Sequence, residues 1–273
     1  MKKTNGSFFA GAFMVVAIAL GGCAPQQVNP SFPTGEDEAE AIIEDIENDG
    51  RPLDRSVLVL AGWADPGFAN SYWVSQLRKA GVPEDQVVGL EFLFDGNFEE
   101  CRDHVISSVD EAWPSDEAGW TSEVDVVAFS MGGLVARYSA SPSMAEGGAE
   151  KRRLKIRNLY TISTPHLGAV MAEWPTLDRR VIDMRADSAF LDHLDDALAE
   201  ASYTLIPYTR LDDDIVGSDR TAPEGRTPWW VDTPPLHRAH QEAYRDPRIR
   251  ADILLRLRGE KPLVSGDAAA LPE

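Results

Sequence analysis

In one stretch of this chain, the pattern of apolar residues changes at a single serine from that of a strand to that of a helix. Residues 124–129 are mostly apolar, as expected for a strand buried on both faces of a sheet, and residues 134–136 follow a helical pattern. Ser130 lies between the two, with the small residues Ala128 and Gly132 on either side. Small residues permit a sharp strand-to-helix turn here, because neighbouring backbones approach closely. The stretch therefore predicts a strand and a helix joined by a tight turn, which raises the Ser130 hydroxyl above the edge of a sheet.

Strand and helix signals alternate along the rest of the body of the chain. Apolar runs that predict further strands occupy residues 57–60, 87–94, 159–163 and 203–208. Apolar residues at helical spacing predict helices over residues 73–80, 101–113, 190–197 and 249–257. The alternation predicts an α/β fold in which a mainly parallel sheet carries helices on both faces.

The first 22 residues have the layout of a secretory signal peptide. Lys2 and Lys3 precede an apolar run at residues 8–20. That run is shorter than the roughly 20 residues that a membrane span needs. Residues 1–22 are therefore predicted to be a cleaved leader, with an uncleaved anchor as the alternative.

The end of this leader, Leu20-Gly21-Gly22-Cys23, resembles the lipobox of bacterial lipoproteins. In that family the cysteine receives a diacylglyceryl group and becomes the new N-terminus. The resemblance implies lipidation at Cys23 and a stable membrane anchor in the cell envelope. Ala24, in place of Asp, implies the periplasmic side of the outer membrane if the cell is Gram-negative. The alternative is an ordinary signal peptide, which would leave Cys23 able to pair with Cys101, otherwise expected as a buried apolar residue.

Two further segments differ in composition from the body of the chain. Residues 23–52 combine prolines with an acidic run, and they predict a tether that holds at most a short helix. Residues 260–273 are small and polar, and they predict a flexible tail. The folded domain is accordingly expected at residues 53–259.

The charge of the chain limits its partners. The net charge is −19, and loss of Lys2 and Lys3 with the leader takes it to −21. Such a surface repels nucleic acid and anionic headgroups, so no nucleic-acid role is expected. The sequence has no His, Cys and carboxylate cluster at metal-ligand spacing, and no phosphate-binding glycine loop follows its first strand. No cofactor or metal is expected.

Several segments together resemble a known family. Residues 129–138, Phe-Ser-Met-Gly-Gly-Leu-Val-Ala-Arg-Tyr, resemble the HSMGGLVAR stretch of bacterial lipases and of the GPI inositol-deacylase-like branch of the α/β hydrolases. Residues 161–168 are similar to the TPHxG strand end of those families, and residues 57–63 to their lvlvHGw segment. Ala61 replaces the usual His, and Ala128-Phe129 the usual Gly-His. The resemblance covers about residues 56–258, and it implies the α/β-hydrolase fold with Ser130 as nucleophile.

The resemblance also implies partners for Ser130, in the order serine, acid, histidine. Four aspartates follow the strand at 203–208, and the family's D-G-x-V form favours Asp213; the others are Asp212, Asp214 and Asp219. Residues 240–247 are similar to the family's HsxlxxDp segment and favour His240, with His237 as the alternative. The N–H groups that stabilise an oxyanion are expected from Met131 and Trp63.

The implied activity is hydrolysis of small-molecule carboxylic esters through an acyl-enzyme. The segment between Ser163 and Asp213 is where this fold carries a small lid. Its apolar candidates favour lipid-like acyl groups; they are Trp174, Leu177, Phe190 and Leu194. The alternatives are a thioesterase or amidase on the same fold, and a catalytically silent lipoprotein that binds an envelope partner.

Lipidation at Cys23 is the first testable expectation. Mass spectrometry of the mature protein should find an N-terminal cysteine that carries acyl groups, and Cys23→Ser should abolish both the modification and membrane retention. An unmodified N-terminus generated at another position would contradict the prediction.

Overall fold

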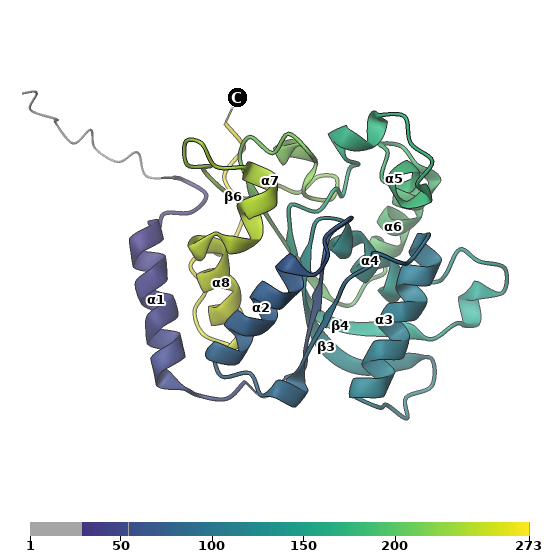
Figure 1. The fold of residues 1–273 in the computed structure, drawn as a ribbon, viewed down its shortest axis with the longest axis horizontal. Helices are drawn as coiled ribbons and strands as arrows, with labels where there is room; N and C mark the ends of the chain where they lie inside the picture. The colour runs from purple at the N-terminus through teal and green to yellow at the C-terminus, as the bar shows by residue number, and fades with distance from the viewer. Residues whose placement is uncertain (1–28, 54, 273) are drawn as a thin grey trace, which may run out of the picture.

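The computed structural model describes residues 29–53 and 55–272 (Figure 1). The expected leader and Cys23 lie outside the described residues. None of the helices formed by the described residues combines the length and apolar character that spanning a bilayer requires.

The described residues form one six-stranded parallel sheet with the strand order β2-β1-β3-β4-β5-β6. The strands are β1 Val57–Leu60, β2 Val87–Leu90, β3 Trp120–Phe129, β4 Arg153–Ile162, β5 Thr204–Arg210 and β6 Trp229–Val231. The chain runs from β1 outward to β2 and then returns to β3 on the other side of β1. This reversal opens a crevice at the carboxyl ends of β1 and β3, which is where open α/β sheets place their sites.

Helices cover both faces of the sheet (Figure 1). Helices α1 Glu36–Asp49, α2 Phe68–Lys79 and α8 Pro247–Leu257 share one apolar core with Val57 and Val59 of β1. Helices α3 Phe98–Ala112, α4 Met131–Ala140 and α6 Ala189–Ala199 share the other core with Leu58 and Leu60. Successive residues of a strand point to opposite faces, so a fully apolar strand supplies both cores. The predicted α/β architecture is confirmed.

The strands differ from the sequence-based expectation at several points. β3 and β4 begin several residues earlier than predicted, and their first residues, Trp120 and Arg153, are paired. The Arg153 guanidinium lies 4.4 Å from the centre of the Trp120 ring. β2 ends at Leu90, because the chain then leaves the sheet. The short strand β6 was not predicted, since three apolar residues are too few to signal a strand.

The N-terminal segment is not a free tether, and the predicted boundary at residue 53 is wrong. Phe32, Ile43 and Ile46 are buried in the core that α1 shares with α8. Arg250 of α8 donates to Glu40 at 2.7 Å, and Arg258 donates to the Ile46 carbonyl at 3.0 Å. The acidic run therefore pairs with arginines that lie some 200 residues away, which its composition alone does not indicate.

The predicted flexible tail is also packed onto the domain. Val264 is buried, and its backbone N–H donates to Asp252 at 3.1 Å. The Trp230 indole donates to the Ala269 carbonyl at 2.8 Å. Small residues let this irregular segment lie close against β6 and α8.

Substitution of Ile43 distinguishes a packed α1 from a tether. Ile43→Ala removes a side chain that is 3% exposed, so it should lower the free energy of unfolding by about 2–5 kcal/mol in urea titrations. Glu44→Ala, at an exposed neighbouring position, should have little effect. Equal unfolding midpoints for Ile43→Ala and the wild type would show that α1 does not pack in solution.

Candidate active site

Ser130 occupies the turn between β3 and α4. Its backbone has a φ of 52° and a ψ of −127°, a conformation that side-chain-bearing residues seldom adopt. Two hydrogen bonds hold it there: Ser130 N–H donates to the Ile162 carbonyl at 2.9 Å, and Thr164 Oγ1 donates to the Ser130 carbonyl at 2.8 Å. The hydroxyl is thereby fixed above the carboxyl edge of the sheet.

Glycines make room for this turn. A Cβ on Gly132 would lie 2.6 Å from the carbonyl oxygens of Leu60 and Ala61, and one on Gly133 would lie 2.2 Å from Thr164 Oγ1. On the facing loop, a Cβ on Gly62 would lie 3.0 Å from Ser130 Cβ. The small residues on both sides of the turn are therefore required by contacts with β1 and with the loop after β4.

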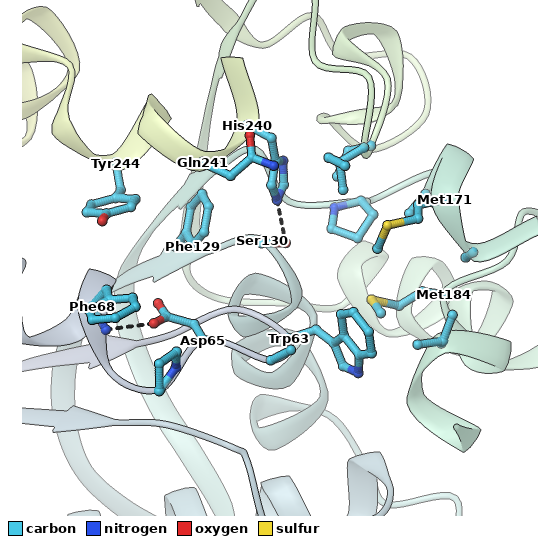
Figure 2. A pocket seen from close by; sticks show the side chains of 18 residues that line it. Trp63, Asp65, Phe68, Phe129, Ser130, Met171, Met184, His240, Gln241 and Tyr244 are labelled. Atoms are coloured by element: carbon cyan, nitrogen blue, oxygen red, sulfur yellow. Dashed lines mark hydrogen bonds between the residues drawn. The ribbon is translucent and has the colours of Figure 1, made fainter. Parts of the chain in front are cut away.

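His240 lies beside Ser130 at the start of α7 (Ala239–Glu242). Its Nε2 is 3.1 Å from Ser130 Oγ (Figure 2). The imidazole is buried against the Phe129 ring, with 5.1 Å between the ring centroids. The alternative, His237, is exposed and is paired with Glu242 at 2.5 Å.

Asp213 follows β5 and accepts a hydrogen bond from the other side of the imidazole. Asp213 Oδ2 lies 2.8 Å from His240 Nδ1, and its Oδ1 accepts the backbone N–H groups of Ile215 and Val216. Burial raises the pKa of Asp213, but His240 and the two N–H groups outweigh it and hold the pKa below its ordinary value. Asp212 and Asp214 are exposed. Of the candidate acids, the structure brings only Asp213 against His240.

A buried ion pair ties together the segments that carry Asp213 and His240. Asp246 is fully buried and accepts from the Arg210 guanidinium at 3.0 Å. It also caps α8, through the Arg248 N–H at 3.0 Å. Arg210 ends β5, three residues before Asp213, and Asp246 lies six residues after His240. The HsxlxxDp resemblance included Asp246, but the sequence did not indicate Arg210 as its partner.

The two N–H groups predicted to stabilise an oxyanion lie on either side of Ser130. Met131 begins α4, and Trp63 follows Gly62, whose Cα faces Ser130. Within the described part of the chain, neither backbone N–H donates to a protein acceptor.

The Trp63 side chain is anchored by residues that the sequence analysis missed. Its indole N–H donates to Asp178 at 2.9 Å, and Asp178 pairs with Arg180 at 2.9 Å. Arg180 also donates to the Phe92 carbonyl at 2.5 Å. Although partial burial raises the pKa of Asp178, the hydrogen bonds from Arg180 and Trp63 lower it from 3.8 to about 2. The pair at the start of α5 (Arg179–Asp183) thus holds the loops after β1 and β2 together.

A cavity of about 430 Å³ opens at Ser130 (Figure 2). Its walls are mainly apolar and include Phe68, Met171, Val181, Met184, Ile215 and Tyr244. Asp65, the one carboxylate in the lining, accepts the backbone N–H groups of residues 67–69. The volume and lining suit an uncharged, apolar group.

The segment predicted to form a lid divides into two parts. Trp174 and Leu177 are exposed beside the cavity-lining turn that contains Met171. Phe190 and Leu194 are instead buried in the core, where Phe190 stacks on Phe98 at 4.1 Å between centroids. Their assignment to a lid face is wrong, because α6 packs against α3 and α4.

Other candidate reactive groups have structural partners. His166 is fully buried between Arg137, which donates to its Nδ1 at 3.0 Å, and Thr161. Burial, and then the Arg137 charge, lower its pKa well below the ordinary value. Cys101 is buried in α3, as predicted, and burial raises the pKa of its thiol to about 12. In the described residues, no three His, Cys or carboxylate side chains are placed to share a metal ion.

Comparison with known proteins gives one family match and several structural similarities. Residues 92–182, about a third of the chain, match the family described as "Putative serine esterase (DUF676)". No curated protein sequence matches the chain. Among solved structures, the chain is similar to the mature lipase BlEst2 of Bacillus licheniformis, with 13% identity, a TM-score of 0.46, and coverage of 76% of this chain and 93% of that chain.

The chain is also similar to phospholipase PlaB of Legionella pneumophila in complex with thio-NAD. The identity is 11%, the TM-score is 0.44, and the match covers 62% of this chain and 44% of the phospholipase. The chain therefore spans less than half of that protein. The parallel sheet and the strand-turn-helix at Ser130 give this protein the architecture of an α/β hydrolase, and residues 92–182 match a serine esterase family.

The Asp178 pair predicts a pH-dependent stability. A carboxylate whose pKa falls from 3.8 to about 2 on folding stabilises the protein above pH 4, and this stabilisation is lost as the pH falls through about 2. Asp178→Asn should therefore lower the urea midpoint at pH 7, and the difference from the wild type should shrink between pH 4 and pH 2.5. Asp187→Asn, at an exposed position with a φ of 56° that suits Asn, is the control. A difference that does not change with pH would contradict the assigned charge interaction.

Proposed function

We propose that this protein hydrolyses carboxylic esters through an acyl-enzyme formed on Ser130, with His240 as the base and Asp213 as its orienting acid. One observation carries the proposal. Ser130 Oγ, the two nitrogens of His240 and Asp213 Oδ2 form a continuous hydrogen-bonded chain with separations of 3.1 and 2.8 Å. This is the relation of nucleophile, base and acid that serine hydrolases share.

The proposed reaction begins with proton transfer from Ser130 Oγ to His240 Nε2 as the oxygen attacks the ester carbonyl. Asp213 accepts the Nδ1–H of His240, so it holds the tautomer in which Nε2 is the base and stabilises the imidazolium that forms. Its low pKa keeps it ionised at neutral pH. The oxyanion is bound by the N–H groups of Met131 and Trp63, at the positive end of α4.

The tetrahedral intermediate then collapses. His240 Nε2 returns its proton to the leaving alkoxide, the ester C–O bond breaks, and an acyl-Ser130 ester remains. Water enters, loses a proton to His240 and attacks the acyl carbonyl. The second tetrahedral intermediate collapses as its bond to Ser130 Oγ breaks, His240 returns the proton to Oγ, and the carboxylic acid leaves.

The substrate is proposed to be an ester with a lipid-like acyl group. The apolar walls of the cavity support this proposal, because an alkyl chain gains free energy on leaving water for such a surface. The Asp65 carboxylate already accepts three backbone N–H groups, so it is not available to bind a charged acyl group.

The proposed location is the cell envelope, with the protein held on the membrane by a lipid on Cys23. In a Gram-negative cell this is the periplasmic side of the outer membrane. The residue order before Cys23 supports the proposal.

Removal of the nucleophile is the direct test. Ser130→Ala should lower the turnover of p-nitrophenyl esters by about 10⁴-fold or more without loss of folded structure, because no other group in the site can form the acyl-enzyme. A fluorophosphonate probe should label the wild type and the control Ser71→Ala, but not Ser130→Ala. If the protein hydrolysed thioesters or amides but no esters, the proposed substrate class would be wrong. Near wild-type ester turnover by folded Ser130→Ala would exclude the mechanism.

The neighbouring aspartates provide matched controls for the acid. Asp213→Asn removes the charge that orients His240 and should lower kcat by on the order of 10⁴-fold. Asp214→Asn and Asp212→Asn change exposed side chains and should stay within about tenfold of the wild type. Loss of activity in Asp214→Asn with retention in Asp213→Asn would reverse the assignment.

A further inference from the structure

The exposed apolar side chains of this protein are unevenly distributed. Among the described residues, six large apolar side chains are at least half exposed: Phe68, Phe94, Trp174, Leu177, Leu236 and Met144. The first five lie on segments that follow the carboxyl ends of β1, β2, β4 and β6. Met144 alone follows α4, on the way back to the start of β4. We call the first five the apolar rim.

The apolar rim lies at the edge of the sheet where the cavity opens. The strands are parallel, so the segments that leave their carboxyl ends meet at one edge of the sheet, which is the edge that carries Ser130. Phe68 itself lines the cavity, and Trp174 follows the turn that contributes Met171. Helices α5 and α7, which follow two of the rim segments, stand at the same end of the molecule in Figure 1.

The described chain also begins toward this edge. Asn29 donates to the Trp230 carbonyl of β6 at 3.2 Å, one residue before that strand ends. Six peptide steps separate Cys23 from Asn29, which is at most about 20 Å of extended chain. A lipid on Cys23 would therefore hold the edge that carries the rim close to the membrane.

The exposed side chains suit a lipid surface better than a folded partner. Single exposed apolar residues are ordinary, but a set of them at one edge of the molecule marks an interaction site. Trp, Phe and Leu are the residues that partition into the headgroup region of a bilayer. The net charge of −19 gives no attraction to anionic headgroups, so the complementary surface is a zwitterionic one.

We propose that the apolar rim docks the enzyme on zwitterionic phospholipid, with the mouth of the cavity facing the bilayer. The docking rests on the positions of the five rim side chains. Its consequence, direct entry of a lipid acyl group from the bilayer to Ser130, rests on the proposed function. An enzyme placed in this way acts on the membrane surface that carries its own anchor.

Single fluorescent labels test the docking without catalysis. Leu177→Cys, Leu236→Cys and the control Met144→Cys each introduce one exposed thiol for an environment-sensitive NBD label. Cys101 is buried with a pKa of about 12, so it should not react, and unsubstituted protein measures any other labelling. The vesicles are ether-linked phosphatidylcholine, which no esterase cleaves, and flotation verifies that the protein is bound.

When vesicles are added, the NBD emission of labels at positions 177 and 236 should rise several-fold and shift to shorter wavelength, because these labels enter the bilayer. The emission of the label at position 144 should not change. A lipid anchor alone would bind the protein but leave all three labels in water, and that result would overturn the proposal. So would an absence of vesicle binding, or a stronger response to phosphatidylglycerol than to phosphatidylcholine.

A second experiment separates docking from chemistry. The double variant Trp174→Ser with Leu177→Ser changes two exposed rim residues that do not line the cavity. It should keep wild-type turnover of a water-soluble ester, but lose about tenfold or more in hydrolysis of phosphatidylcholine vesicles. Met144→Ser should change neither rate. Equal loss on both substrates would assign these residues to the fold, and no loss on vesicles would exclude the rim as a docking surface.

Discussion

The site depends on a close approach of two backbones beneath Ser130. The turn from β3 into α4 passes so near to the end of β1 that a Cβ on Gly132 would lie 2.6 Å from two carbonyl oxygens. The strain of a positive φ at Ser130 is balanced by hydrogen bonds to Ile162 and Thr164, on the adjoining strand β4 and the loop after it. The Ser130 hydroxyl is therefore held above the carboxyl edge of the sheet, 3.1 Å from His240 Nε2.

Electrostatic pairing fixes the remaining parts of the site around this turn. Asp213 is buried, and its charge is stabilised by His240 and two backbone N–H groups rather than by water. Arg210 and Asp246 join the segments that carry the acid and the histidine, and Asp178 joins α5 to Trp63. One buried ion pair, Arg210–Asp246, and one hydrogen bond, from Trp63 to Asp178, thus join segments that lie far apart in sequence.

The sequence patterns succeeded where the information is local. Continuous apolar runs predicted β1, β3, β4 and β5, because strands of a covered parallel sheet need apolar residues on both sides. They failed where distant residues decide the outcome. Ile43 and Val264 lie in segments that are acidic or small on average, yet each fills a gap against α8. Phe190 has the same helical spacing whether α6 covers the cavity or, as found, the core.

By itself the sequence determined the α/β class, the tight turn at Ser130 and the small set of residues able to act with it, because each follows from residue size and order over a few positions. Only the tertiary structure decided that Asp213 rather than Asp214 faces His240, that His240 rather than His237 reaches Ser130, and that Asp178 anchors Trp63. Those choices depend on the direction in which side chains leave loops. The spacing of the family motifs favoured Asp213 and His240, but the packing of separate strands and helices sets that direction.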